Sequence, residues 1–241
     1  MTTEAAENRF TPISRQTWRR ILIIVLAILV LELSAGIWIY ISRNVSVPEI
    51  DIPGVTVFTP AKDLPAFELT DHDGRPFDND SLRGRWTLAA FGYTSCPDFC
   101  PTTLAEMARL FDRLTRTPEA GQAPQFVFIS VDPYRDTPEQ LASYVGYFHP
   151  DFLGVTGAAG KLQRLNDSLG IHFEYADPDT NLPIRDVLHE PAIDHYIVDH
   201  YSGLLLVDPR GRLVATLLPP FDVERTLEVY HQLRNHYGGS S

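Results

Sequence analysis

The chain has 241 residues, of which 44% are hydrophobic and 21% are charged. These values fit one globular domain with an additional segment, and they exclude general disorder. The two cysteines are too few for a disulfide-rich scaffold or a four-cysteine zinc module.

The net charge of −11 is unevenly distributed along the chain. Residues 1–43 contain five Arg and three Glu, a net charge of +2, so the rest of the chain carries −13. A domain this acidic repels phosphate backbones, which makes nucleic acid a poor partner and leaves cations and basic protein surfaces compatible. An acidic surface that serves only solubility explains the charge equally well.

Residues 21–41 form an apolar run with one charged residue, Glu32. At about 1.5 Å per residue, a helix of this length crosses a bilayer core of about 30 Å. We therefore predict a single transmembrane helix at residues 21–41. A cleaved signal peptide is the alternative, with residues 34–36 as a weak cleavage site.

Basic residues indicate the orientation of this helix. Arg15, Arg19 and Arg20 precede the apolar run, and Arg43 alone follows it closely. The positive-inside rule then places residues 1–20 in the cytoplasm and the rest of the chain beyond the membrane. A bacterial inner-membrane protein with a periplasmic domain is the simplest interpretation.

The remainder of the chain reads as a linker, residues 42–64, followed by a domain, residues 65–241. Apolar runs and helical periodicities alternate in the domain, and a polar loop covers residues 176–192. We expect strands at residues 67–70, 86–93, 125–131, 171–175, 196–198, 204–207 and 213–218, and helices at 102–116, 137–148, 160–169 and 223–237. This order predicts an α/β thioredoxin-like fold, a central mixed sheet flanked by helices.

Cys96 and Cys100 lie where the strand at residues 86–93 gives way to a helix. Backbone N–H groups and the positive dipole end at a helix N-terminus stabilise a thiolate, which is both nucleophile and metal ligand. Three residues separate the cysteines, whereas thioredoxin-like oxidoreductases use two. Two thiolates with a distant imidazole would suit Cu(I), with room to rearrange for Cu(II). A plain disulfide or two inert thiols are the alternatives.

Four segments in this order resemble the Sco/SenC family of copper-binding, thioredoxin-like proteins. The similarity extends from about residue 66 to residue 237. The segments are residues 91–104 (FGYTSCPDFCPTTL), 130–139 (SVDPYRDTPE), 148–157 (FHPDFLGVTG), and 196–200 (YIVDH) followed by 208–211 (DPRG).

The resemblance implies a role in assembling the dinuclear copper centre of cytochrome c oxidase subunit II. It implies Cys96, Cys100 and His200 as copper ligands, for Cu(I), Cu(II) or both, and Asp132 as an acidic residue that supports the site. Another periplasmic copper chaperone or a thioredoxin-like reductant would be a further partner. Residues 176–194 do not align clearly with the family.

The other histidines are weaker candidates. His189 could be an accessory ligand, whereas His195 would point to the opposite face of a strand shared with His200. We expect structural or surface roles for the remaining ones, which are His72, His149, His172, His231 and His236.

Two functions compete at the cysteine pair. The first is a copper metallochaperone, which is not an enzyme, and the second is a membrane-anchored thiol–disulfide reductase that keeps the oxidase cysteines reduced. His200 distinguishes them, because only the copper site needs it. A peroxidase is disfavoured because Ala89 and Tyr93 replace the required Pro and Thr, and a zinc site would lack a fourth protein ligand.

Overall fold

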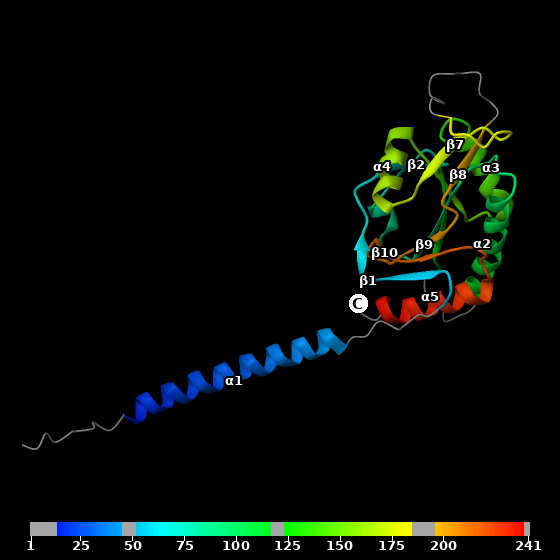
Figure 1. The fold of residues 1–241 in the computed structure, drawn as a ribbon. Helices are drawn as coiled ribbons and strands as arrows, with labels where there is room; N and C mark the ends of the chain where they lie inside the picture. Colours follow the sequence, from blue (N-terminus) through cyan, green and yellow to red (C-terminus); the bar gives the residue numbers. More distant parts are fainter. Residues whose placement is uncertain (1–13, 45–51, 117–122, 185–195, 239–241) are drawn as a thin grey trace, which may run out of the picture. The chain divides into compact units, whose positions relative to one another are not determined.

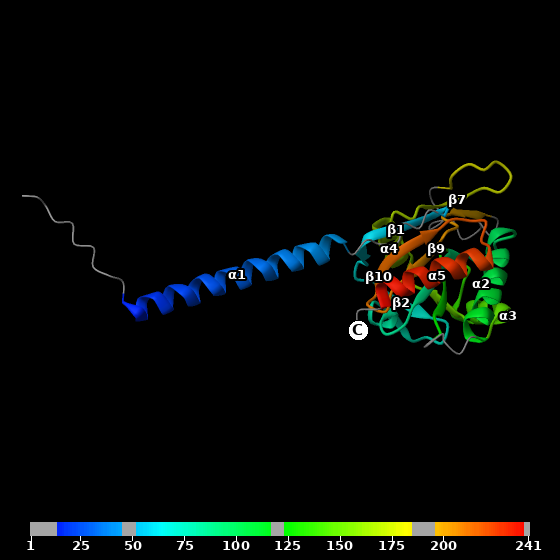
Figure 2. The same ribbon diagram turned by 90° about the horizontal axis from the view of Figure 1, so that it is seen from below.

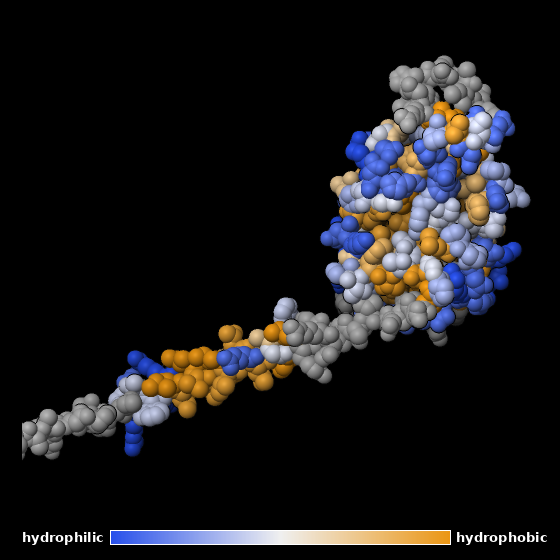
Figure 3. Space-filling model, viewed as in Figure 1, coloured by the Kyte–Doolittle hydropathy of each residue, from blue (hydrophilic) through white to orange (hydrophobic). Residues whose placement is uncertain are grey.

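The computed structural model describes residues 14–44, 52–116, 123–184 and 196–238. The chain divides into two units, Met1–Val47 and Pro48–Ser241, and each is considered by itself. The apolar run predicted at residues 21–41 lies within a longer helix, α1 (Arg15–Asn44). In the described part of the chain it is the one helix long and apolar enough to cross a membrane. Figure 3 shows apolar side chains along its length.

The second unit is built on an eight-stranded mixed sheet (Figure 1). Its strand order is β1-β10-β9-β4-β5-β6-β2-β3, and β4, β5 and β6 run parallel while the other pairs are antiparallel. The strands are β1 (Val55–Asp63), β2 (Glu68–Asp71), β3 (Pro76–Asp78), β4 (Thr87–Gly92), β5 (Gln125–Ser130), β6 (Leu153–Thr156), β9 (Leu204–Val207) and β10 (Arg212–Leu217). Strands β7 (Phe173–Ala176) and β8 (Ile197–His200) form a separate two-stranded sheet.

Helices cover both faces of the main sheet (Figures 1 and 2). They are α2 (Phe99–Arg116), α3 (Pro138–Phe148), α4 (Ala159–Leu169) and α5 (Val223–Gly238), with a 3-10 turn, η1, at Asp80–Leu82. Side chains alternate along β4, so Leu88 and Ala90 face the core formed with α2, α3 and α5, and Ala89 and Phe91 face the core formed with α4. The predicted thioredoxin-like arrangement, a mixed sheet flanked by helices, is confirmed.

Helix α3 shows how local sequence fixes an element that borders the site. The Thr137 hydroxyl accepts the Gln140 backbone N–H at 3.3 Å, and the Gln140 side chain accepts the Thr137 N–H at 3.1 Å. This capping box, followed by Pro138, starts the helix where the sequence predicts it.

Several elements differ from the sequence prediction. Residues 55–63, expected in the linker, form β1, which pairs with β10 along the sheet edge. The four-residue strand β6 was not predicted. Helix α2 begins at Phe99 instead of residue 102, so Cys100 lies inside the helix and Cys96 alone lies in the preceding turn.

Candidate metal centre

The site begins where β4 ends. The chain leaves β4 at Gly92, turns, and enters α2 at Phe99. In the turn, the Cys96 N–H donates to the Tyr93 carbonyl at 3.2 Å. Both cysteines are free thiols; Cys96 is half-buried and Cys100 is buried. The turn therefore offers one accessible and one protected sulfur.

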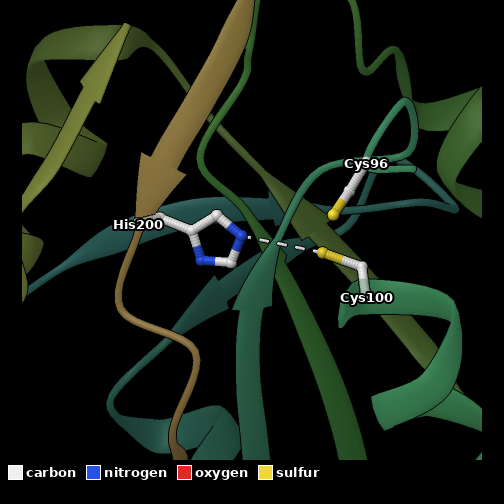
Figure 4. A group of neighbouring side chains, drawn as sticks. All are labelled: Cys96, Cys100 and His200. Atoms are coloured by element: carbon white, nitrogen blue, oxygen red, sulfur yellow. Dashed lines mark hydrogen bonds between the residues drawn. The ribbon is translucent and has the colours of Figure 1, made fainter. Parts of the chain in front are cut away.

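His200, the last residue of β8, meets this pair from the other side of the site (Figure 4). Its Nε2 atom lies 3.7 Å from the Cys100 sulfur. The two sulfurs and one imidazole nitrogen all lie within 4.8 Å of one another. The structure thus brings together three of the residues predicted to bind metal, across 100 positions of sequence.

The hydrogen bond made by Nδ1 of His200 determines which ring nitrogen is available to a metal ion. Nδ1 lies 2.9 Å from the Tyr201 carbonyl oxygen, which can only accept a hydrogen bond. Nδ1 therefore carries a proton, and Nε2 is the ring atom that can offer a lone pair toward the cysteines. This is the tautomer that a metal-binding histidine needs.

The pKa values of the two thiols are shifted in opposite directions. A hydrogen bond from Cys100 lowers the pKa of Cys96 to about 3, with further help from the backbone at residues 98 and 100. The same hydrogen bond, together with burial, raises the pKa of Cys100 above the usual thiol range. The pair therefore shares one proton, which Cys100 keeps while Cys96 is a thiolate.

The three donor atoms have a spacing that fits a metal ion. With metal–sulfur and metal–nitrogen bonds of about 2.3 and 2.0 Å, trigonal coordination separates sulfur from nitrogen by about 3.7 Å and sulfur from sulfur by about 4.0 Å. The observed 3.7 Å separation and the 4.8 Å limit on all three distances match this geometry to within a small side-chain movement. Soft thiolates with one imidazole favour a soft ion.

Comparison with known proteins agrees with this architecture. The SCO1/SenC family model matches residues 59–235. This chain belongs to the SCO1/SenC family. A SCO2-like protein of Rickettsia felis is 32% identical over 188 residues, 77% of this chain and 85% of the relative.

Two solved structures show the same fold. Arabidopsis thaliana ScoI with copper bound has a TM-score of 0.60 at 30% identity, over 71% of this chain and 98% of ScoI. BsSco, described with a disulfide switch and as a member of the Sco family of cytochrome c oxidase assembly proteins, has a TM-score of 0.53 at 21% identity, over 73% of this chain and 95% of BsSco. The second likeness supports the fold alone.

Asp132 lies in the loop after β5 in this SCO1/SenC chain. It is fully buried, and its carboxylate accepts hydrogen bonds from Arg135 and from the Tyr196 hydroxyl, the latter at 2.7 Å. Its side-chain hydrogen bonds go to Arg135 and Tyr196, not to Cys96, Cys100 or His200. Its predicted supporting role would therefore act through those two residues.

Two residues of the site escaped the sequence prediction. An added Cβ at Gly92 would lie 2.6 Å from the Cys100 sulfur and 2.6 Å from the Phe128 ring, so only glycine leaves room for the sulfur. Asp136 accepts the Thr94 N–H at 3.0 Å and the Thr94 hydroxyl at 2.6 Å, which fixes the turn before Cys96. Both stand in the family-like segments, but single-sequence spacing gives neither a role.

The other histidines are arranged as follows. His72 Nδ1 accepts the Gly154 N–H at 2.9 Å, and the His149 ring lies 4.3 Å from that of Phe111, so both have structural contacts. His172 lines a cleft of about 610 Å³ that also borders His200, with Glu174 and Asp199 in its wall. The predictions for His189 and His195 fall outside the described residues.

Proposed function

We propose that this protein binds copper through Cys96, Cys100 and His200 and delivers it during assembly of the dinuclear copper centre of cytochrome c oxidase subunit II. The observation that carries the proposal is the convergence of two sulfurs and one imidazole nitrogen within 4.8 Å. Membership of a family with copper-bound structures supports the choice of ion. The oxidase partner rests on the family resemblance.

Ligand chemistry supports both copper oxidation states. Thiolates favour Cu(I), and a three-donor site open on one side can accept a fourth ligand for Cu(II). Cys96 is half-buried, so solvent reaches the site at this sulfur. A site with such access can exchange its ion with another protein.

Copper titration tests the proposal. The full chain in detergent, with its cysteines reduced under anaerobic conditions, is titrated with copper, and the absorption spectrum is recorded in the oxidised-copper state. We expect a strong sulfur-to-copper charge-transfer band that saturates at about one equivalent. His200→Ala should weaken binding and alter the band, and His231→Ala, at an exposed position of α5, is the control. No band in the unmodified chain would refute the copper site.

A thiol–disulfide reductase is the second candidate, and the asymmetry of the thiols favours it. The Cys96 thiolate would attack a disulfide of the oxidase, form a mixed disulfide and release one thiolate of the target. Once Cys96 loses its negative charge, Cys100 can ionise and attack the Cys96 sulfur. The products are the Cys96–Cys100 disulfide and a reduced dithiol, so two electrons pass to the target. Rapid turnover that His200→Ala leaves unchanged would support this function.

Helix α1 would anchor the protein in the membrane. Its length and apolar surface support a single span, and the three Arg at its N-terminal end support a cytoplasmic N-terminus. The copper-binding domain would then lie in the periplasm of a bacterial inner membrane, where the copper-binding part of an oxidase is accessible. A periplasmic copper donor and a thioredoxin-like reductant are compatible partners for the half-buried Cys96.

A further inference from the structure

His200 lies on an element that the main sheet does not hold. Among the described strands, β8 pairs with β7 alone, whereas Cys96 and Cys100 follow β4 at the centre of the eight-stranded sheet. Strand pairing therefore holds each half of the site, but no strand pairing joins β8 to the main sheet among the described residues. The position of His200 against the two sulfurs depends on the three-residue connection from β8 to β9 and on side-chain contacts between the two sheets.

The loop after β5 forms hydrogen bonds with Tyr196, the residue directly before β8. The Tyr196 hydroxyl donates to Asp132 at 2.7 Å, and the Tyr196 carbonyl accepts a hydrogen bond from Arg135 Nη1 at 3.0 Å. The guanidinium group of Arg135 also lies 3.6 Å above the Tyr196 ring, while its Nε donates to Asp132. One arginine thus holds both the ring and the backbone of the residue directly before β8.

The same guanidinium group reaches the cysteine side of the site. It lies 5.6 Å from the ring of Tyr93, and this ring meets that of His200 edge-on at 5.8 Å. The Tyr93 backbone carbonyl also accepts the Cys96 N–H at 3.2 Å. Arg135 therefore contacts residues on both sides of the junction.

We propose that Arg135 is a positioning residue, which fixes His200 at the distance from Cys96 and Cys100 that metal binding requires. This inference rests on the proposed copper function. An arginine is needed because its planar fork can donate to Asp132 and to the Tyr196 carbonyl while it stacks on a ring. Lysine would keep the charge but could not maintain all three contacts.

The test uses Arg135→Lys in the full chain, with Arg212→Lys as the matched control. Arg212 forms a comparable pair with buried Asp208, and the exposed fractions of the two arginine side chains are 26% and 22%. The control pair lies at the turn between β9 and β10. Both variants should lose similar amounts of thermal stability. A difference in copper affinity between them would therefore come from the position of His200 and not from general destabilisation.

Copper affinity is measured by competition with a chelator in four chains: unmodified, Arg135→Lys, His200→Ala and the double variant. We expect Arg135→Lys to weaken binding by about tenfold or more, as is typical when a residue that orients a metal ligand is changed. In the His200→Ala background the same substitution should have little further effect, since it acts through His200. Arg212→Lys should leave affinity unchanged.

A second readout needs no metal. Amide hydrogen exchange of residues 197–200 should accelerate in metal-free Arg135→Lys, while exchange in β9 and β10 should not. Unchanged affinity and unchanged exchange in β8 would overturn the inference, as would an equal loss of affinity with and without His200. Absence of copper binding in the unmodified chain would instead refute the proposed function, and the exchange measurement would still test the role of Arg135.

Discussion

At the residue scale, Gly92 lies beside the site at a position that has no room for a side chain. A methyl group at this position would lie 2.6 Å from both the Cys100 sulfur and the Phe128 ring. We predict that Gly92→Ala displaces the sulfur and lowers copper affinity by about tenfold or more. Crowding in a packed core should also reduce the free energy of unfolding by about 1–3 kcal/mol.

Gly146→Ala provides the control for Gly92→Ala. Gly146 lies within α3, and an added Cβ there would meet no atom within 4 Å. Alanine favours a helix over glycine by about 1 kcal/mol, so this variant should be slightly more stable and bind copper normally. If Gly92→Ala bound copper as tightly as the control, the sulfur would not depend on this space.

The thiolate of Cys96 gives a pH prediction. Because its pKa is lowered to about 3, its alkylation by iodoacetamide in the metal-free protein should change little between pH 5 and pH 8. The unfolded thiol keeps its proton in this range, so the ionisation of Cys96 makes the folded state more stable as pH rises and less stable as pH falls toward 3. Mass spectrometry would identify the alkylated residue. A rate that increases about tenfold per pH unit would show an ordinary thiol.

At the element scale, the sequence predicts those strands and helices that have a clear local pattern of apolar residues. Strands β4 and β5 are continuous apolar runs, and α2 has apolar residues at helical spacing, so both types of element are evident from sequence. Strand β1 was missed because half-exposed residues alternate irregularly and its register shifts between Val57 and Lys62. Strand β6 has too few residues to show a period.

The residues of the candidate site also divide into those that local sequence predicts and those that it does not. Cys96 and Cys100 were predicted from their position between a strand and a helix, and His200 from the resemblance of its segment to the Sco/SenC family. The roles of Gly92 and Arg135 depend on contacts with residues on other elements, which spacing within one sequence does not encode. Sequence therefore predicts the donor atoms, whereas the residues that hold them at the right separation emerge from tertiary packing.

The strand β1 leads to a prediction about truncation. A chain that starts at residue 65 loses β1, leaves the β10 edge unpaired and removes apolar contacts of Ile52, Val55 and Val57 with the core. Partial burial of three such side chains corresponds to about 3 kcal/mol or more, so this chain should unfold at much lower urea concentration than one starting at residue 48. Equal unfolding midpoints would mean that β1 contributes little.

At the scale of the whole molecule, the chain combines an apolar helix with a domain that has a hydrophobic core of its own. Among the described residues of the domain, both core clusters lie between Ile52 and Tyr237. The exposed side chains of α1 are apolar along most of its length. The physical requirements of folding and of membrane anchoring are therefore met by different segments.

This separation predicts that the full chain and a chain starting at residue 48 will behave differently. The full chain should remain in the membrane fraction after a high-salt or alkaline wash, because about 20 apolar residues, not surface charge, hold it there. The chain starting at residue 48 should be soluble, fold cooperatively and bind copper with the same stoichiometry. Fractionation followed by copper analysis measures both. Release of the full chain by salt would contradict a spanning helix, and loss of copper binding on truncation would mean that α1 contributes to the site.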